Sequence, residues 1–140
     1  MPLQMQADEL LGFLEEVFPQ VAGDFAIDRL EDMKIDLRLK VAERHLRPGS
    51  TVSGPSMFAL ADCAVYMIVL AMIGRQALAV TTNCSIDFMR KPEADRDLIA
   101  SCRLLKLGRV LAVGDVLIRS EGAATPVARA SLTYSIPPRA

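Results

Sequence analysis

A long apolar stretch with a single acid inside it constrains this chain more than any other feature. The stretch runs from Met57 to Ile73, follows Gly54-Pro55, and contains one carboxylate, Asp62. A helix that is apolar on every side must be enclosed all round, by protein or by lipid. An ionised carboxylate in such a helix is costly unless it is paired or has a chemical role. The sequence therefore predicts one enclosed helix that carries one acid.

The length of this stretch also approaches that of a membrane span. A transmembrane helix needs about 20 apolar residues, and a charge near its middle is disfavoured. No Lys/Arg-rich flank precedes the stretch, and the rest of the chain reads as alternating strands. These features favour a protein outside the membrane, in which a sheet closes over the helix.

Composition narrows the class of protein further. With 140 residues the chain is expected to form a single domain, residues 1–140, and its net charge of −1 gives no reason to expect a nucleic-acid partner. No signal peptide is visible at the start of the sequence. The cysteines Cys63, Cys84 and Cys102 are scattered in apolar contexts, which is typical of reduced core thiols in a cytoplasmic protein. A single histidine, His45, and no Cys-x-x-Cys spacing argue against a metal site.

The first half of the chain contains one helical pattern and two strand patterns. Asp8 can cap a helix whose apolar residues recur at helical spacing from Leu10 to Phe18, with Pro19 and Gly23 ending it. A short strand is expected at 25–30, and 34–41 alternates polar and apolar residues without a fault. A loop from His45 to Ser53 then leads to the apolar helix, for which Gly74 is a plausible C-cap.

The second half reads as strands joined by short connections. Residues 77–88 alternate, with Leu78, Val80, Thr82, Cys84, Ile86 and Phe88 on one face and Thr81, Asn83, Ser85 and Asp87 on the other. Three more strands are expected at 98–107, 110–120 and 127–136, with turns at Gly108-Arg109 and Glu121-Gly122. The order is helix, two strands, buried helix and four strands, which predicts an α+β fold with a largely antiparallel sheet.

Several motifs in this order resemble a known family. Residues 47–55 read Arg-Pro-Gly-Ser-Thr-Val-Ser-Gly-Pro and residues 60–64 read Leu-Ala-Asp-Cys-Ala, with Phe-Met-Arg-Lys-Pro at 88–92. This is similar to the phenylacetic-acid-degradation type of acyl-CoA thioesterase, which shows Asn-x-x-Gly-x-x-His-Gly-Gly and an Asp nine residues after the His. Ser53 and Asp62 keep that spacing. The resemblance implies the hotdog fold, a curved antiparallel sheet wrapped around one long helix, here with an additional N-terminal helix.

The resemblance also implies an activity and its residues. Asp62 would act as general base or nucleophile in hydrolysis of an acyl-CoA thioester, and the Gly54 N–H at the helix N-terminus would polarise the carbonyl. In the family these two groups come from different subunits. Thr81 falls near a strand position where relatives carry a water-orienting hydroxyl, although a slip of one residue would select Thr82. No cofactor is expected, because CoA is part of the substrate.

The expected substrate-binding residues lie along the rest of the motif and on basic turns. They are Arg47, Ser53, Asn83, Arg90, Lys91, Gly108 and Arg109. Arginine suits phosphate oxygens, and glycine lets a ligand approach the backbone. Arg47 and Ser53 stand where the family has its Asn and His, and each basic residue alone would also fit an ordinary solvated surface.

Three functions remain open at this point. The first is thioester hydrolysis, the second is binding of acyl-CoA without hydrolysis, which the changes at Arg47 and Ser53 favour, and the third is hydration or dehydration on the same fold. The third generally pairs an acid with a His, but His45 is expected on the surface after a strand rather than opposite Asp62. The strand at 77–88 would leave a long sheet edge open, so a homo-oligomer, dimer or tetramer, is expected.

Overall fold

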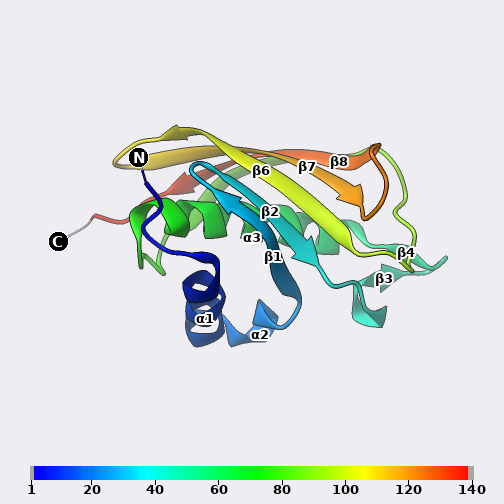
Figure 1. Cartoon of the computed structure of the whole chain (residues 1–140). Coiled ribbons are helices and arrows are strands. Elements are labelled where there is room, and N and C mark those ends of the chain that lie inside the picture. Colours follow the sequence, from blue (N-terminus) through cyan, green and yellow to red (C-terminus); the bar gives the residue numbers. More distant parts are fainter. Residues whose placement is uncertain (1, 139–140) are drawn as a thin grey trace.

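A curved antiparallel sheet covers one long helix in this protein (Figure 1). The computed structural model describes residues 2–138. The helices are α1 (Ala7–Val17), α2 (Pro19–Ala22) and α3 (Gly54–Ile73). The strands are β1 (Phe25–Glu31), β2 (Lys34–Leu39), β3 (Leu46–Arg47), β4 (Thr51–Val52), β5 (Val80–Phe88), β6 (Leu98–Leu107), β7 (Leu111–Ser120) and β8 (Pro126–Ser135). This is the α+β arrangement that the sequence and its resemblance predict.

Helix α3 begins and ends where its sequence signals indicate. Ser53 is the N-cap, and its Oγ accepts a hydrogen bond from the Ser56 N–H at 3.2 Å. Pro55 occupies the first turn, where its missing N–H costs nothing. At the other end Gly74 has a φ of 92°, and its N–H donates to the Leu70 carbonyl at 2.8 Å.

Most of the apolar surface of α3 is enclosed by protein. By length and hydropathy this helix could cross a membrane, with a mean hydropathy of 2.1 over its most apolar window. Of its 20 residues, however, 11 are buried, and the helix packs against β2, β5, β6, β7 and β8. The sheet therefore supplies the enclosure that the apolar sequence requires, and α3 is the core helix of the fold.

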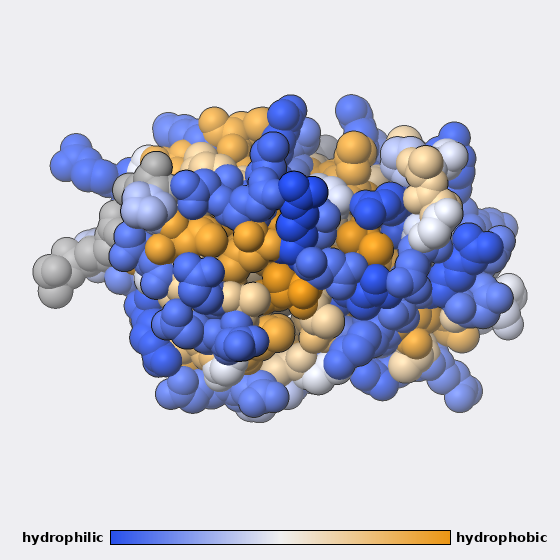
Figure 2. All heavy atoms as spheres, in the orientation of Figure 1, coloured by the Kyte–Doolittle hydropathy of each residue, from blue (hydrophilic) through white to orange (hydrophobic). Residues whose placement is uncertain are grey.

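The main sheet has six strands in the order β1-β2-β6-β7-β8-β5, and every neighbouring pair is antiparallel. Strands β1 and β5 form its two edges. Large apolar side chains remain exposed along the β5 edge and its flanks, at Leu78, Val80, Phe88 and Met89. On the face shown in Figure 2, by contrast, polar residues surround the apolar ones that reach the surface.

The N-terminal segment differs from its sequence prediction in two respects. Helix α1 starts earlier than an Asp8 cap requires, because Gln6 is the N-cap and its N–H donates to the Glu9 carboxylate at 3.2 Å. Asp8 lies inside the first turn, where a negative charge favours the helix dipole. Helix α1 ends at Val17, just before Pro19 as predicted, but Pro19 then begins a further short helix, α2, which Gly23 ends.

Some boundaries and one loop also differ from the predictions. The loop from His45 to Ser53 contains a small antiparallel ladder, β3 with β4, which the sequence did not indicate. Strand β2 ends at Leu39 rather than at residue 41, and β5 starts at Val80 rather than at residue 77. In both cases the sequence pattern continues past the end of the strand. The boundary is set by where hydrogen-bonded pairing with the neighbouring strand stops.

Candidate active site

Two hydroxyl groups hold the carboxylate of Asp62 on α3. The Thr81 Oγ1 of β5 and the Tyr134 hydroxyl of β8 both donate to Asp62 Oδ1, the latter at 2.8 Å. Within residues 2–138, no group donates to the second oxygen, Oδ2. Asp62 is half-buried, and it lines a cavity. One oxygen is thus fixed by the protein and the other is available to a ligand or a water molecule.

A bulge in β5 places Thr81 on Asp62. Thr81 pairs with Tyr134 and Asn83 pairs with Thr133, so Thr82 is an extra residue in the ladder. The predicted alternation is therefore wrong before the bulge. Thr81 points towards the helix, as Cys84 and Ile86 do beyond the bulge, and not with the exposed Asn83. Between the two candidates, it is Thr81 and not Thr82 that contacts the acid.

Tyr134 is the residue of this site that the sequence analysis missed. Its ring is 3% exposed, and its hydroxyl also lies 3.0 Å from the Asp62 carbonyl oxygen. Burial and the neighbouring Asp62 carboxylate raise the pKa of Tyr134 above its usual value, so the phenol stays neutral and donates. Alternation along 127–136 could have placed Tyr134 on the inner face, but nothing in the sequence pointed it at an acid 72 residues away.

The cavity beside Asp62 is apolar and has a volume of about 500 Å³. Its walls come from the junction of α1 with α2, from the middle of α3, and from the start of β5, and include Phe18, Val21, Phe58, Cys63, Tyr66 and Val80. Cys63 was expected to be core packing, but it is half-buried in this wall. Burial and the adjacent Asp62 raise the pKa of the Cys63 thiol, so a reactive thiolate is disfavoured.

Gly54 presents an unpaired N–H at the start of α3. Pro55 has no N–H, and the Ser56 N–H donates to the Ser53 side chain, so Gly54 supplies the remaining donor of the first turn. In the described part of the chain no acceptor faces it. A Cβ at Gly54 would lie 3.3 Å from the Phe88 Cζ, so a side chain here would press on the Phe88 ring.

Some of the predicted substrate-binding residues gather around Gly54. Arg47, Arg90 and Lys91 line one groove with Gly54, of about 420 Å³, and the Arg90 guanidinium also donates to the Pro126 carbonyl at 2.7 Å. Ser53 serves as the helix cap. Asn83 is exposed on β5 and does not line either cavity.

The Gly108-Arg109 turn lies at the other end of the sheet in the same chain. Leu111, which follows this turn, pairs with Ser135, as Val80 does at the start of β5. Phe88, which lies against Gly54, pairs instead with Ala128 at the opposite end of β8. A single chain therefore brings Arg47, Arg90 and Lys91 together but leaves Arg109 and Gly108 apart from them.

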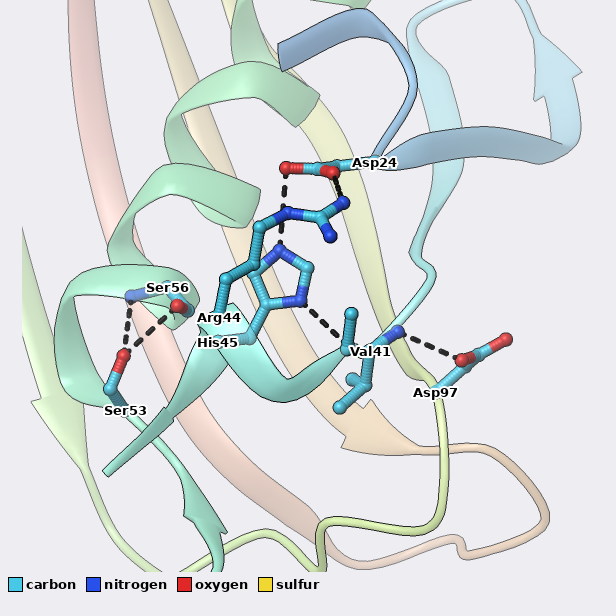
Figure 3. Close-up of polar contacts among 8 residues, drawn as sticks. Asp24, Val41, Arg44, His45, Ser53, Ser56 and Asp97 are labelled. Atoms are coloured by element: carbon cyan, nitrogen blue, oxygen red, sulfur yellow. Dashed lines mark hydrogen bonds and ion pairs between the residues drawn. The ribbon is translucent and has the colours of Figure 1, made fainter. Parts of the chain in front are cut away.

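His45 is buried, which corrects the expectation of a surface histidine. The residue is 6% exposed, its Nδ1 accepts from the Ala42 N–H at 2.9 Å, and its Nε2 lies 3.3 Å from Asp24 Oδ2 (Figure 3). The His45 backbone carbonyl accepts from the Ser53 N–H at 2.8 Å, which connects the His45 backbone to the start of α3. Both ring nitrogens are thus engaged, and His45 lines neither the cavity at Asp62 nor the groove at Gly54.

Asp24 is the acceptor that holds this histidine, and it also bonds Arg44. Burial by itself raises the pKa of Asp24, but the hydrogen bonds from Arg44 and His45 outweigh burial and leave the pKa below its usual value. Asp24 follows α2, so the Asp24–His45 contact links the N-terminal segment to the loop before α3.

Metal ligands do not cluster in the part of the chain described. Across residues 2–138, no three His, Cys, Asp or Glu side chains lie close enough together to hold an ion. The three cysteines are free thiols. Cys102 is buried, and burial followed by the charge of Asp115 raises its pKa to about 12.

Comparison with known proteins places this geometry in a family. Residues 49–127 match the family model of the Thioesterase superfamily. A candidate thioesterase from Silicibacter sp. TM1040 is 65% identical, with 99% of this chain and 96% of that chain covered and a TM-score of 0.92. A search of curated proteins found no match.

More distant solved structures share the fold. A mutant of the phenylacetic acid degradation protein PaaI from Thermus thermophilus is 24% identical, with 85% of this chain and 99% of that chain covered and a TM-score of 0.73. A Streptococcus mutans protein bound to acetyl-CoA is 22% identical, with 82% and 90% covered and a TM-score of 0.71. The long matched span and the 65% identity together establish that this chain belongs to the Thioesterase superfamily and has the hotdog fold.

Proposed function

We propose that this protein hydrolyses an acyl-CoA thioester to CoA and a carboxylic acid. The observation that carries the proposal is the state of Asp62, whose Oδ1 is held by two hydroxyl donors while Oδ2 has no partner in the described chain and the residue lines an apolar cavity. Membership of the superfamily supports thioester hydrolysis as the reaction class.

The proposed reaction uses Asp62 and Gly54 on opposite sides of the thioester. Asp62 Oδ2 takes a proton from water as the water oxygen attacks the carbonyl carbon. The Gly54 N–H then donates to the developing oxyanion, and collapse of this intermediate expels the CoA sulfur as a thiolate, which takes up the proton. Direct attack by Asp62 on the carbonyl is the alternative route and would use the same oxygen. Water is the only co-reactant, so the proposal requires no cofactor.

The two groups are too far apart in one chain to act on one carbonyl. They are eight residues apart on α3, a separation of about 12 Å at 1.5 Å per residue. We therefore propose that the site is shared between two copies of the chain, as the resemblance implies.

The β5 edge offers the geometry for such sharing. If two β5 edges pair antiparallel about a twofold axis, the Phe88 end of one strand meets the Val80 end of the other. Gly54 lies against Phe88, and Asp62 lies against Thr81 next to Val80. The pairing would thus bring Gly54 of one copy towards Asp62 of the other, and would move Arg90 and Lys91 towards the end of the sheet that carries Arg109 in the partner.

These basic residues suit the nucleotide part of CoA. Replacing Arg90 and Lys91, or Arg109, by Ala should weaken binding of a whole CoA thioester more than that of a truncated pantetheine thioester, which lacks the nucleotide phosphates. An unchanged ratio of the two affinities would make these charges ordinary surface residues. The free thiols fit a reducing compartment, and we propose the cytoplasm as the location.

The deciding experiment is Asp62→Asn, measured as CoA release with a thiol reagent across a panel of acyl-CoAs. Asn keeps the volume but cannot take a proton from water, so turnover should fall about 10²- to 10⁴-fold while the fold persists. The matched control is Asp115→Asn, an exposed carboxylate on β7 outside both cavities. Full activity in stable Asp62→Asn protein would contradict the proposal.

Binding of acyl-CoA without hydrolysis is the second candidate, and two positions favour it. Ser53 stands where the family has its His, and its side chain is engaged as the helix cap; Arg47 stands where the family has its Asn. A wild-type protein that binds CoA esters and releases no CoA would favour this candidate. Hydration is less well supported, because both nitrogens of His45 face other groups.

A further inference from the structure

The N-terminal segment forms part of the wall of the cavity beside Asp62. Val17, Phe18, Gln20 and Val21, at the junction of α1 with α2, line this cavity. The segment lies outside residues 49–127, the part of the chain that matches the superfamily model. Strands β1 and β2 also lie outside this range, so the segment is distinguished by its position at the cavity, where it can contact the ligand.

This wall is attached firmly to the core on one side and exposes apolar side chains on the other. Leu10 and Leu14 of α1 are fully buried, and Phe18 is tied to Leu14 by a 2.7 Å hydrogen bond from its N–H. Phe18 itself is 45% exposed, at the non-helical residue between the two helices. An apolar side chain left open at a cavity mouth gains from covering an apolar ligand.

In a single chain, the cavity beside Asp62 has more room than a small acyl group fills. A benzene ring fills an engineered cavity of about 150 Å³, whereas the volume here is about 500 Å³. An acetyl group would leave most of this apolar surface uncovered, and each additional buried methylene contributes to binding.

The charged residues among the cavity lining also limit which acyl groups fit. Among the lining residues that the structure describes, Asp62 is the only ionisable carboxylate, and no Lys, Arg or His is present. An acyl group ending in a second carboxylate would meet no cation among the lining residues of its own chain and would be repelled by Asp62. Tyr66 already donates its hydroxyl to the Ala77 carbonyl at 2.9 Å, so this part of the wall also offers an apolar face.

We infer that the α1–α2 segment selects the acyl group, and that the substrate carries an uncharged, apolar acyl group larger than acetyl. This inference rests on the proposed function for the orientation of the thioester, with its carbonyl at Asp62. Val21 and Phe18 are the specificity-determining residues, one half-buried in the wall and one at its exposed rim.

The test uses S-alkyl-CoA thioethers, which bind like thioesters but cannot be hydrolysed. Calorimetric affinities for ethyl-CoA, octyl-CoA and a carboxyheptyl-CoA are measured on the full-length wild type and on Val21→Phe and Phe18→Ala. We expect the wild type to prefer octyl-CoA over ethyl-CoA by at least about 10-fold, because buried methylenes add affinity, and to reject the carboxylated chain. Val21→Phe fills the cavity and should remove most of the octyl preference while changing ethyl-CoA affinity less than about twofold.

Phe18→Ala and a surface control complete the design. Phe18→Ala opens the rim and should reduce the octyl preference without affecting ethyl-CoA, and the fold should persist because the side chain is exposed. Glu15→Ala, an exposed residue of α1 outside the cavity, should behave as wild type. Equal affinities for ethyl- and octyl-CoA, or a preference unmoved by both cavity variants, would overturn the inference even if the protein hydrolyses thioesters. If the protein has no hydrolytic activity but its octyl preference shifts as expected in the two variants, the inference that the α1–α2 segment selects the acyl group stands. Only the proposed function is then contradicted.

Discussion

At the scale of single residues, the two Asp62 oxygens have unequal surroundings, as the proposed role of Asp62 requires. Here Thr81 and Tyr134 converge on Oδ1, and Oδ2 is left to the cavity. Under the proposed function, the two hydroxyls act as positioning groups for the free oxygen.

Removing one of these hydroxyls gives a residue-scale prediction. Tyr134→Phe keeps the ring but removes a donor to an ionised carboxylate, a bond worth about 1.5–3 kcal/mol. We expect kcat/KM to fall roughly 10-fold, because the donor that holds the Asp62 carboxylate is lost. Thr133→Val, on the neighbouring residue whose side chain lies on the opposite face of β8, is the control. An unchanged kcat/KM in Tyr134→Phe would contradict this role.

At the scale of elements, the close contact between the sheet and α3 depends on a glycine in β7. A Cβ at Gly114 would lie 2.9 Å from a Val65 methyl carbon of α3, closer than real contacts permit. The bulge at Thr82 shows the same dependence on local backbone, because it turns Thr81 towards the helix. Small irregularities in strands thus determine what α3 can contact.

Gly114→Ala tests this contact. Overpacking against Val65 should lower the free energy of unfolding by about 1–3 kcal/mol, measured by urea denaturation. Adding Val65→Ala should recover part of the loss, giving a favourable coupling in a double-mutant cycle. Gly12→Ala in α1 has no atom within 4 Å of the new Cβ and should instead stabilise by about 0.5–1 kcal/mol. Additive effects of Gly114→Ala and Val65→Ala would contradict the contact.

The link between Asp24 and the loop before α3 predicts a pH dependence of stability. The pKa of Asp24 is lowered in the folded state, so its ionised form stabilises the fold above the unfolded pKa, and this contribution is lost as the pH falls through the folded pKa. Asp24→Asn should therefore flatten the decline of unfolding free energy below about pH 5. The decline should remain in Asp115→Asn; a wild-type slope in Asp24→Asn would show that other groups cause it.

At the scale of the whole molecule, a shared site makes activity a property of the pair of chains. Under the proposed arrangement, Asp62→Asn and Gly54→Val each inactivate both sites of a homodimer, the second by blocking the approach beside Phe88. A hybrid dimer would keep one intact site, formed by Asp62 of one copy and Gly54 of the other.

Mixing the two inactive variants after dissociation should therefore restore activity to roughly a quarter of the wild-type value, because half of the dimers are hybrids with one site each. Differently tagged chains allow the hybrids to be purified and assayed alone. The control mixes Asp62→Asn with wild type, where no gain above dilution is expected. Hybrids without activity, or a monomer in light scattering at micromolar concentration, would contradict the shared site.

The sequence alone determined the features that follow from local pattern. An apolar stretch that had to be enclosed, Gly54-Pro55 at its start, a C-cap at Gly74, and alternation in the last strands predicted a central helix under an antiparallel sheet, and the spacing of Ser53 to Asp62 indicated the family. These features depend on helix ends and on burial, which neighbouring residues specify.

Only the tertiary structure decided which side chains meet. The donor from Tyr134, the bulge that selects Thr81, the burial of His45 against Asp24, and the approach of α2 to Asp62 all join segments distant in sequence. A bulge changes the face of a residue without changing the residues themselves, so alternation could not have predicted it. Contacts of this kind arise from how the sheet curves over α3, which no single segment encodes.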